Sequence, residues 1–414
     1  MLTVSHPTGN QNLRALLAGV ADAGLLSAFH TSLASFEGDW LYRLAGLPGL
    51  SEFRRRSFPA SVRAETHQHP LYDLTRILAL RAGATGLTRS EGAPFSIDSV
   101  YHDLDRRVAA SLRSGGGSRA VYAYEDGARD TFRAAHLHGQ RCIYDLPIGY
   151  WRSASAILAA ELDAKPEWAP TVRTLDASPA KLGRKDEELH LADAIFVASA
   201  FTASTLRDYP GQLAPIHKVS YGYPNVTAER DYRARRAGEP LRLLFVGGLS
   251  QRKGLSYVFE AAEALGNDVA LTVIGHKPPK FCAPLERGLN ACTYIPSLPH
   301  ADVLKLMREH DVLLFPSLFE GFGLVITEAM SQGTPVITTA HTAGPDVLTH
   351  GEEGWIVETS TAEPIVEILA DLIRHPEKAV AVGEAAQARA RHRPWSVYGR
   401  EAAAELRELL TPAA

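Results

Sequence analysis

From residue 241 onward, short apolar runs rich in leucine, valine and isoleucine alternate with amphipathic stretches. Strands are predicted at 241–247, 269–274, 312–316 and 335–338, and helices at 255–265, 301–309 and 324–332. Parallel strands need long crossover connections, which are usually helices, so this alternation is typical of βαβ units around a parallel sheet. The second half of the chain is therefore predicted to be a doubly wound α/β domain.

The first half of the chain repeats this pattern less regularly. Its strand candidates lie at 120–124, 141–145, 194–197 and 217–221, which predicts a second doubly wound domain. A polar segment at 222–240, with four arginines and a proline near each end, has the composition of a linker. We therefore expect an α/β protein with two Rossmann-like domains that face each other across a cleft, where the carboxyl ends of the strands bind ligands.

The composition excludes several classes of protein. The 43 basic residues against 47 acidic ones give a net charge of −4, so the chain has no overall positive field that would bind nucleic acid. The three cysteines, Cys142, Cys282 and Cys292, have neither metal-cluster nor disulfide-framework spacing, which fits a reducing compartment. No apolar run approaches the roughly 20 residues of a membrane span, and residues 1–10 do not resemble a secretory signal. We expect a cytoplasmic protein.

The first of two candidate loops follows the strand at 241–247. This first loop (residues 247–254) contains Gly247 and Gly248, and then the adjacent cations Arg252 and Lys253 before a helix. Glycines let the backbone approach an anion, and a helix N-terminus beside two cations can neutralise a diphosphate. The spacing fits neither a P-loop nor a dinucleotide fingerprint, and the alternative is a solvated βα turn.

The second loop (residues 316–323) follows the strand at 312–316. It contains Glu320 and the glycines Gly321 and Gly323, and Glu328 follows in the next helix. Carboxylates beside a diphosphate would repel it unless they accept hydrogen bonds from neutral hydroxyls, so both glutamates are predicted to bind sugar hydroxyls. The alternative is that they are ordinary carboxylates at a helix start, favoured by the macrodipole.

Together the two loops resemble a known family. The chain reads Gly-Gly-x-x-x-Arg-Lys-Gly after one strand and Pro-Ser-x-x-Glu-Gly-Phe-Gly-x-x-x-x-Glu-Ala after another, then Gly-Thr-Pro-Val from Gly333 and Gly-x-x-Gly from Gly351. This is similar to the donor half of the family 4 retaining glycosyltransferases of the GT-B fold. The resemblance is specific over residues 241–358 and weaker elsewhere, although residues 144–150 and 186–201 contain stretches that look like acceptor-domain segments of some bacterial members.

The resemblance implies a donor site for a nucleotide-diphosphate sugar. Glu320 would contact the donor sugar, and Arg252 and Lys253 the diphosphate, so these three would be the catalytic residues. Glu328 would hold the nucleotide ribose. The rest of the implied donor-binding set comprises Gly247, Gly248, Tyr294, Ile295, Gly321, Phe322, Gly323 and Leu324. The implied domains are 1–222 for the acceptor, 223–395 for the donor, and 396–414 with a helix that crosses back to the first domain.

The acceptor side has fewer matching residues. Gly9 and Asn10 follow a short strand, as in the first loop of a GT-B acceptor domain, with a plain βα turn as the alternative. Tyr124, Glu125 and Asp145 lie at predicted strand ends and are further acceptor-side candidates, with strand-end packing as the alternative. Family members often place a histidine where this chain reads Asp-Leu-Pro, so the acceptor-side catalytic group stays open.

No metal or other cofactor is expected. Asp103 and Asp105 match the D-x-D metal signature of the other glycosyltransferase fold, but they precede two arginines in a predicted helix and are expected to be solvated. The His-x-His pairs at 67–69 and 136–138 lack further zinc ligands and are expected at the surface. For the pair at 136–138, lining of the acceptor cleft is the alternative.

The resemblance therefore implies an enzyme that transfers a sugar from a nucleotide-diphosphate donor to an unidentified acceptor with retention of configuration. The acceptor would be a glycan, a lipid-linked glycan or a small molecule. Residues 52–58 mix aromatics with arginines, which suggests contact with the inner face of the membrane, and a solvated charged loop is the alternative. Two other functions stay open: a non-catalytic nucleotide-sugar-binding subunit, and a phosphorylase or epimerase on the same fold. The sequence specifies neither the base, the donor sugar nor the oligomeric state.

Overall fold

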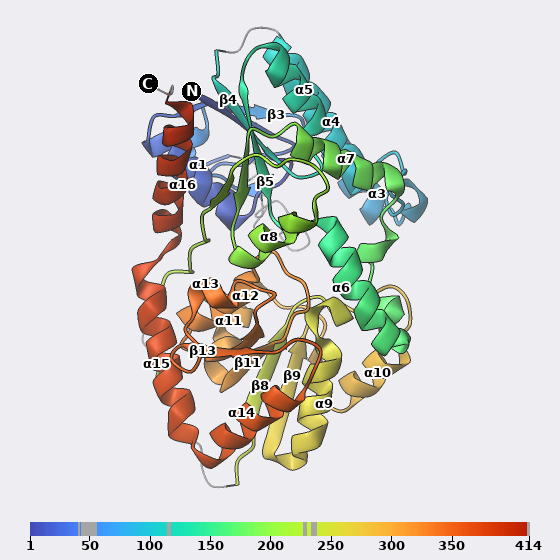
Figure 1. Cartoon of the computed structure of the whole chain (residues 1–414), viewed down its shortest axis with the longest axis vertical. Helices are drawn as coiled ribbons and strands as arrows, with labels where there is room; N and C mark the ends of the chain where they lie inside the picture. The colour runs from blue at the N-terminus through green and yellow to red at the C-terminus, as the bar shows by residue number, and fades with distance from the viewer. Residues whose placement is uncertain (40–41, 43–55, 114–116, 227–229, 233–237, 412–414) are drawn as a thin grey trace.

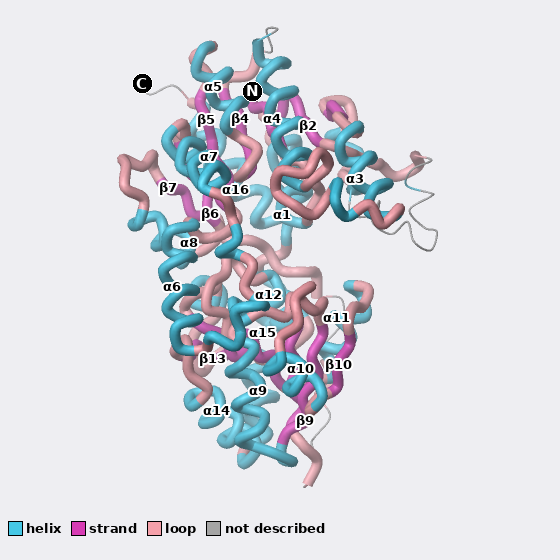
Figure 2. Tube along the Cα trace, turned by 90° about the vertical axis from the view of Figure 1, so that its right-hand side faces the viewer, coloured by secondary structure: helices cyan, strands magenta, loops and turns pink. Residues whose placement is uncertain are grey.

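The computed structural model describes residues 1–39, 42, 56–113, 117–226, 230–232 and 238–411. Two α/β units lie one above the other along the long axis of the molecule, as Figure 1 shows. In the view turned by 90°, helices flank the strands of both units (Figure 2). The predicted fold class, two doubly wound Rossmann-like domains, is confirmed.

The N-terminal unit contains a seven-stranded parallel sheet. Its strands are β1 (Leu2–Ser5), β2 (Leu26–Thr31), β3 (Thr66–Gln68), β4 (Ala120–Tyr124), β5 (Arg141–Leu146), β6 (Ala194–Val197) and β7 (Ile216–Lys218). They lie in the order β3-β2-β1-β4-β5-β6-β7. Strands β1 and β6 are buried along their whole length; β6 reads as a continuous apolar run, whereas β1 alternates apolar residues with threonine and serine.

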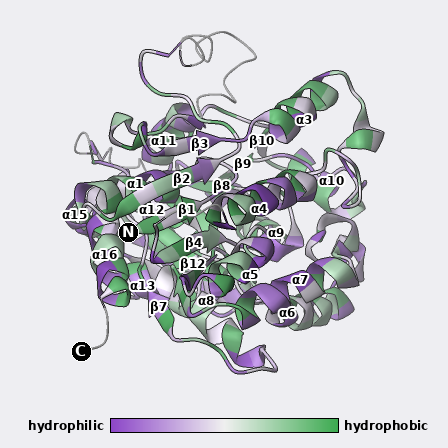
Figure 3. Cartoon of the chain, turned by 90° about the horizontal axis from the view of Figure 1, so that it is seen from above, coloured by the Kyte–Doolittle hydropathy of each residue, from purple (hydrophilic) through white to green (hydrophobic). Residues whose placement is uncertain are grey.

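Helices cover both faces of this sheet. They are α1 (Gln11–Asp22), α3 (Leu71–Arg81), α4 (Ile97–Arg113), α5 (Arg129–Leu137), α6 (Trp151–Ala164), α7 (Pro179–His190) and α8 (Ala200–Thr205). Seen from above, the sheet passes between α1 on one side and α4 with α5 on the other (Figure 3). The side chains of α4 and α5 form one hydrophobic cluster with β4, β5 and β6.

The C-terminal unit contains a six-stranded parallel sheet in the order β10-β9-β8-β11-β12-β13. Its strands are β8 (Leu241–Val246), β9 (Val269–Ile274), β10 (Thr293–Ile295), β11 (Val312–Phe315), β12 (Val336–Thr339) and β13 (Gly354–Val357). Its helices are α9 (Leu255–Leu265), α10 (Ala283–Asn290), α11 (His300–Glu309), α12 (Leu324–Ser331), α13 (Gly344–Val347), α14 (Glu363–Arg374) and α15 (Pro376–His392). The strands and helices predicted in this half agree with the structure to within one residue at each end.

One strand prediction in the first half was wrong. The strand expected at 217–221 ends at Lys218, because the chain leaves the sheet and turns toward the last helix, α16 (Trp395–Leu410). There the Tyr221 ring packs 5.2 Å from the ring of Tyr398 and 6.0 Å from that of Trp395. Residues 219–221 thus leave the sheet, and Tyr221 packs against α16 instead of extending the edge strand β7.

Helix α16 packs closely along α1 of the N-terminal unit (Figure 1). A Cβ atom added to Gly19 would lie 2.0 Å from the carbonyl oxygen of Gly399, and one added to Gly399 would lie 2.3 Å from that of Ala15. Glycine on both helices is therefore what allows their backbones to touch.

Helix α6 makes the opposite crossing, from the N-terminal unit onto the C-terminal unit. Leu158 of α6 and Trp168 in the following turn belong to the same hydrophobic cluster as Leu255 and Val258 of α9. The buried carboxylate of Glu161 on α6 accepts hydrogen bonds across the boundary from Gln251, Tyr257 and Ser360, at 2.7, 2.7 and 2.9 Å. The two units thus exchange helices and are not simply two bodies joined by a linker.

We predict that Gly399→Ala destabilises the protein by about 1 to 3 kcal/mol, because the new methyl group would collide with a backbone carbonyl that cannot rotate away. Gly183→Ala on α7 is the matched control: its Cβ would meet nothing within 4 Å, so the change should stabilise the helix by about 0.5 to 1 kcal/mol. Urea unfolding of both variants measures the difference. Equal midpoints for Gly399→Ala and the native protein would show that the two helices do not pack this closely.

Candidate functional site

The two loops singled out from the sequence follow neighbouring strands at the centre of the C-terminal sheet. The first loop continues from β8 and the second from β11, and these strands are adjacent. The strand order reverses between them, since β8 leads outward to β9 and β11 leads outward to β12. Open α/β sheets bind ligands at such a switch point, beyond the carboxyl ends of the strands.

A close backbone contact joins the two loops. Gly254 adopts a left-handed conformation, with φ of 69°, and a Cβ at this position would lie 2.0 Å from the carbonyl oxygen of Pro316. The amide of Leu318 donates to the carbonyl of Arg252 at 2.9 Å. The conformation of one loop therefore determines where the side chains of the other lie.

Three charged side chains meet between these loops, and we call Arg252, Lys253 and Glu320 the charged trio. The Arg252 guanidinium donates to the Phe319 carbonyl at 2.6 Å and lies 3.5 Å from the Glu320 carboxylate, which the Lys253 ammonium also contacts. Burial lowers the pKa of Arg252 to about 10, and burial together with the neighbouring guanidinium lowers the pKa of Lys253. Two cations share one carboxylate here, so an incoming anion would complete the charge balance.

Backbone amides add to this positive character. Within the described part of the chain, no group accepts a hydrogen bond from the amides of the five residues 321–325, which lead into and begin α12. Gly323, with φ of 85°, directly precedes this helix. Free amides at a helix N-terminus are a favourable environment for a negatively charged group.

Two other donor-side candidates, Glu328 and Tyr294, each contact a partner outside the charged trio. Glu328 on α12 accepts a hydrogen bond from His300 of α11 at 2.9 Å, and this bond raises the pKa of the imidazole. The Tyr294 hydroxyl donates to the Gly275 carbonyl at 3.1 Å, and the Lys277 ammonium lies 5.2 Å from its ring centre. Among the described residues, neither pair shares a hydrogen bond or an ion pair with the charged trio. His300 has no motif that would have identified it from the sequence.

The acceptor-side candidates gather at the carboxyl ends of β1, β4 and β5 in the N-terminal sheet. Tyr124 pairs with Asp145 across β4 and β5, and the Glu125 amide donates to the Asp145 carbonyl at 3.1 Å. Burial raises the pKa of the Asp145 carboxyl to about 7, and the Tyr122 hydroxyl hydrogen-bonds to it. The Asn10 side chain caps α1 by accepting from the Leu13 amide at 2.8 Å, next to Gly9.

The second loop touches the N-terminal unit directly. A Cβ at Gly321 would lie 1.8 Å from the Pro147 carbonyl oxygen, in the loop after β5. The Gly321 carbonyl accepts hydrogen bonds from the hydroxyls of Ser199 and Thr202 at 2.5 and 2.9 Å. The Ser-x-x-Thr spacing signals the start of a helix, but nothing local in the sequence links it to a loop 122 residues away.

The D-x-D motif is helical, as predicted, but it is not solvated. Asp105 of α4 is fully buried, where it forms an ion pair with Arg184 of α7 and accepts the amides of Asp130 and Thr131 at 2.9 and 2.7 Å. A buried carboxylate requires such partners, and they come from segments distant in the sequence. Asp105 therefore ties α4 to α5 and α7.

The histidine pairs differ from each other. His69 lies 3.1 Å from a ring nitrogen of His30, a buried residue on β2 that sequence reasoning did not consider. Among the described residues, one group of three or more potential metal ligands comes together: His136, Cys142 and Asp193. Burial and Asp193 raise the pKa of the Cys142 thiol, which disfavours the thiolate that binds metal.

The segment at 52–58 lies partly outside the described residues, which omit 52–55. Of its described part, Arg56 is buried and pairs with Asp73 at 2.7 Å, and Phe58 is also buried. These two side chains therefore face neither a membrane surface nor solvent, so neither interpretation of the segment holds for its described part.

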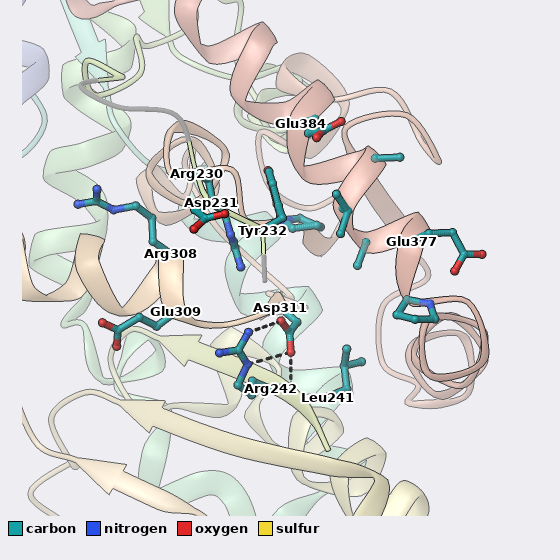
Figure 4. A pocket seen from close by; sticks show the side chains of 15 residues that line it. Arg230, Asp231, Tyr232, Leu241, Arg242, Arg308, Glu309, Asp311, Glu377 and Glu384 are labelled. Atoms are coloured by element: carbon teal, nitrogen blue, oxygen red, sulfur yellow. Dashed lines mark hydrogen bonds and ion pairs between the residues drawn. The ribbon is translucent and has the colours of Figure 1, made fainter. Parts of the chain in front are cut away.

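A cavity of about 660 Å³ lies at the opposite end of the C-terminal sheet (Figure 4). Arg242 and Asp311, at the amino ends of β8 and β11, line it and form a two-point ion pair with nitrogen–oxygen distances of 2.7 and 3.1 Å. Arg230 and Tyr232 of the linker also line it. Because it adjoins the amino ends of the strands, this cavity is not part of the candidate site at the switch point.

Comparison with known families agrees with this geometry. Residues 229–389 match the family model of glycosyl transferases group 1. The matched segment covers most of the C-terminal unit. The match includes both loops and the charged trio.

Curated relatives share 28 to 30% identity with parts of the chain. They include the amylovoran biosynthesis glycosyltransferase AmsK of Erwinia amylovora (29% over 36% of this chain), a D-inositol 3-phosphate glycosyltransferase of Corynebacterium aurimucosum (28% over 54%) and the D-rhamnosyltransferase WbpZ of Pseudomonas aeruginosa (28% over 49%). The chain spans 40, 59 and 56% of the lengths of these proteins, about half.

Solved structures resemble the whole chain. The sucrose-phosphate synthase of Thermosynechococcus elongatus aligns with a TM-score of 0.66 and 15% identity, over 99% of this chain and 98% of that one. The Anabaena protein HepE, in complex with UDP, aligns with a TM-score of 0.62 and 16% identity, over 98% and 99%. At this identity the likeness concerns the fold, which is GT-B. In the described residues, no helix is long and apolar enough to cross a bilayer.

Proposed function

We propose that the protein is a retaining, family 4-like glycosyltransferase that moves a sugar from a nucleotide-diphosphate donor to an acceptor. The observation that carries this proposal is the charged trio: a partly buried group with a surplus positive charge, beside free amides at the switch point of the unit that matches the group 1 model. A diphosphate is the anion whose size and charge suit two adjacent cations and a helix N-terminus. HepE, which shares the fold, was solved with UDP and with UDP-glucose, and this supports a nucleotide sugar as donor.

In the proposed reaction, the bond between the anomeric carbon and the diphosphate oxygen breaks. Negative charge then develops on the terminal phosphate, where Arg252, Lys253 and the amides of residues 321–325 stabilise it. These fixed groups provide the stabilisation that a metal ion would otherwise supply, so we propose that no metal is needed. Glu320 holds a hydroxyl of the donor sugar and keeps the two cations in place.

We propose that the acceptor attacks from the side of the leaving group. A covalent route would need a free carboxylate on the opposite face of the sugar. Of the acceptor-side carboxylates, Glu125 is paired with Lys185 at 2.6 Å, and Asp145 is hydrogen-bonded to Tyr122. In front-face attack the acceptor oxygen bonds to the anomeric carbon, and its proton passes to the released phosphate oxygen.

The remaining assignments follow from this function. Residues 1–222 would bind the acceptor, 223–395 the donor, and the helix in 396–414 would join the two. Glu328 would hold the ribose, and Tyr294 with Ile295 would lie near the base. We propose a cytoplasmic enzyme of polysaccharide or glycoconjugate biosynthesis, and the name of the amylovoran relative supports the biosynthetic role.

We predict that Lys253→Met and Arg252→Met each lower turnover strongly, because a charge-assisted contact to the leaving group contributes about 2 to 4 kcal/mol to the transition state. The nucleotide is first identified by thermal-shift screening with UDP, GDP and ADP, and turnover is then measured with the matching labelled sugars. Lys305→Met, an exposed lysine on α11, is the control. Tight donor binding without turnover in the native protein would instead indicate a non-catalytic subunit.

The two glutamates should separate donor-sugar contacts from nucleotide contacts. Glu320→Gln keeps the shape but loses a charged hydrogen bond of about 1.5 to 3 kcal/mol, so turnover should fall while affinity for the free nucleoside diphosphate changes little. Glu328→Gln should instead weaken the nucleoside diphosphate itself. Calorimetric titration beside turnover tests this. The reverse pattern would mean that the two roles are exchanged.

Activity should survive excess EDTA, since the charge on the leaving group is balanced by side chains and amides. Turnover of enzyme dialysed against chelator, with and without added Mg²⁺ or Mn²⁺, is the measurement. Loss of activity that either ion restores would contradict the metal-free mechanism.

A further inference from the structure

Another cavity, of about 620 Å³, adjoins the second loop from the side of the N-terminal unit. Its walls come from the start of α4, the loop after β4, the loop after β5 and the start of α7, and Phe319 of the second loop also lines it. The cavity therefore lies at the carboxyl ends of β4 and β5. Phe319, which lines it, directly precedes Glu320, a member of the charged trio. Ligands of open α/β sheets bind at this edge.

One wall of this cavity carries a row of alternating charges. The Lys181 ammonium lies 2.6 Å from the Asp98 carboxylate and 3.7 Å from that of Asp126. The Lys185 ammonium lies 3.1 Å from Asp126 and 2.6 Å from Glu125. Asp126 is thus the central member of a row of three carboxylates and two ammonium groups, which we call the charge row.

Asp126 is held in a strained backbone conformation. Its φ of 67° is left-handed, a region that non-glycine residues rarely adopt. The buried Glu188 carboxylate accepts the Asp126 amide at 2.8 Å and the Ala128 amide at 3.0 Å, and thereby fixes this turn. Strain that is maintained by a buried partner is typical of functional sites, and here it directs Asp126 toward both lysines.

The charge row can recognise hydroxyl groups. Burial lowers the pKa of each lysine, but the neighbouring carboxylates outweigh burial and raise the pKa of both Lys181 and Lys185, so both stay charged at neutral pH. Ammonium groups only donate hydrogen bonds and carboxylates only accept them, whereas a sugar hydroxyl does both. A row that alternates between the two therefore suits successive hydroxyls of a carbohydrate.

The overall charge of the cavity argues against an anionic ligand. Five of its lining residues are acidic and four are basic: Glu91, Asp98, Glu125, Asp126 and Asp176, against Arg89, Arg173, Lys181 and Lys185. There is thus no surplus positive charge for a phosphate, in contrast to the charged trio. The rings of Trp151 and Phe319 add apolar surface of the kind that lines ligand pockets.

We propose that this cavity binds the acceptor, that the acceptor is a neutral saccharide, and that Lys181, Asp126 and Lys185 determine this specificity. The proposal rests on the transferase function proposed above, since the cavity adjoins the loop that would hold the donor sugar. Glycoside and sugar-phosphate acceptors differ in charge, so binding experiments can separate them.

The experiment measures binding of small probes to the full-length protein by saturation-transfer NMR, with the nucleoside diphosphate present. The probes are the methyl α-glycosides of glucose, mannose and galactose, with glucose 6-phosphate and inorganic phosphate as the anionic arm. Lys181→Met and Asp126→Asn are the variants, the latter because asparagine tolerates a left-handed backbone. Lys378→Met, paired with Asp371 on the far unit, is the matched control.

We expect at least one glycoside to bind the native protein and the control, and to bind both variants at least tenfold more weakly. Affinity for the nucleoside diphosphate should stay within twofold throughout. Preference for the phosphate probes, equal glycoside binding in both variants, or no glycoside binding would overturn the acceptor assignment. Hydrolysis of the nucleotide sugar, measured without probe, distinguishes the failure of one proposal from the failure of the other. If hydrolysis persists when glycoside binding gives one of these three results, only the acceptor assignment fails. If the native protein neither binds nor hydrolyses the donor, the transferase function fails.

Discussion

The contact of Gly321 with the N-terminal unit determines the geometry of the candidate site. The loop carbonyl accepts two hydroxyl hydrogen bonds from α8 and the residue before it, and only glycine fits against the Pro147 carbonyl. Glu320 directly precedes Gly321 in the chain, so its position between Arg252 and Lys253 depends on this contact. The charges that would meet a diphosphate are therefore placed jointly by both units, and separation of the units would alter the electrostatics of the site.

The two units that meet at this contact differ in how completely their charged and polar groups are paired. In the N-terminal unit, near the proposed acceptor cavity, Arg184 forms ion pairs with Asp105 and Glu188. Both carboxylates also accept hydrogen bonds from backbone amides, so these buried charges are paired and form a rigid base. On the donor side, two partly buried cations share one carboxylate, and among the described residues no group accepts a hydrogen bond from the amides of residues 321–325. Unpaired buried charge lowers stability, and proteins keep it where a ligand supplies the missing partner. The imbalance thus marks the donor side as the ligand-dependent part of the molecule.

The C-terminal fold was predictable because its central strands are buried on both faces and read as apolar runs between helices. The three-residue strands β3 and β10 are too short to give such a pattern, and they went unpredicted. In the candidate site, the sequence identified the side chains but not their pairing. The contact between Lys253 and Glu320, the burial of Asp105 and the bonds from Ser199 all join segments far apart in the chain. Local patterns report backbone preference, whereas these contacts arise only from packing.

The exchange of α6 and α16 between the units has a consequence for protein engineering. A simple chimaera would join the first half of this chain to the second half of a relative at the linker. In this protein such a junction would place a foreign α6 against α9 and a foreign α16 against α1, where Glu161 and Gly399 need specific partners. A functional hybrid should therefore take residues 157–172 from the parent that supplies the second unit, and residues 395–410 from the parent that supplies the first.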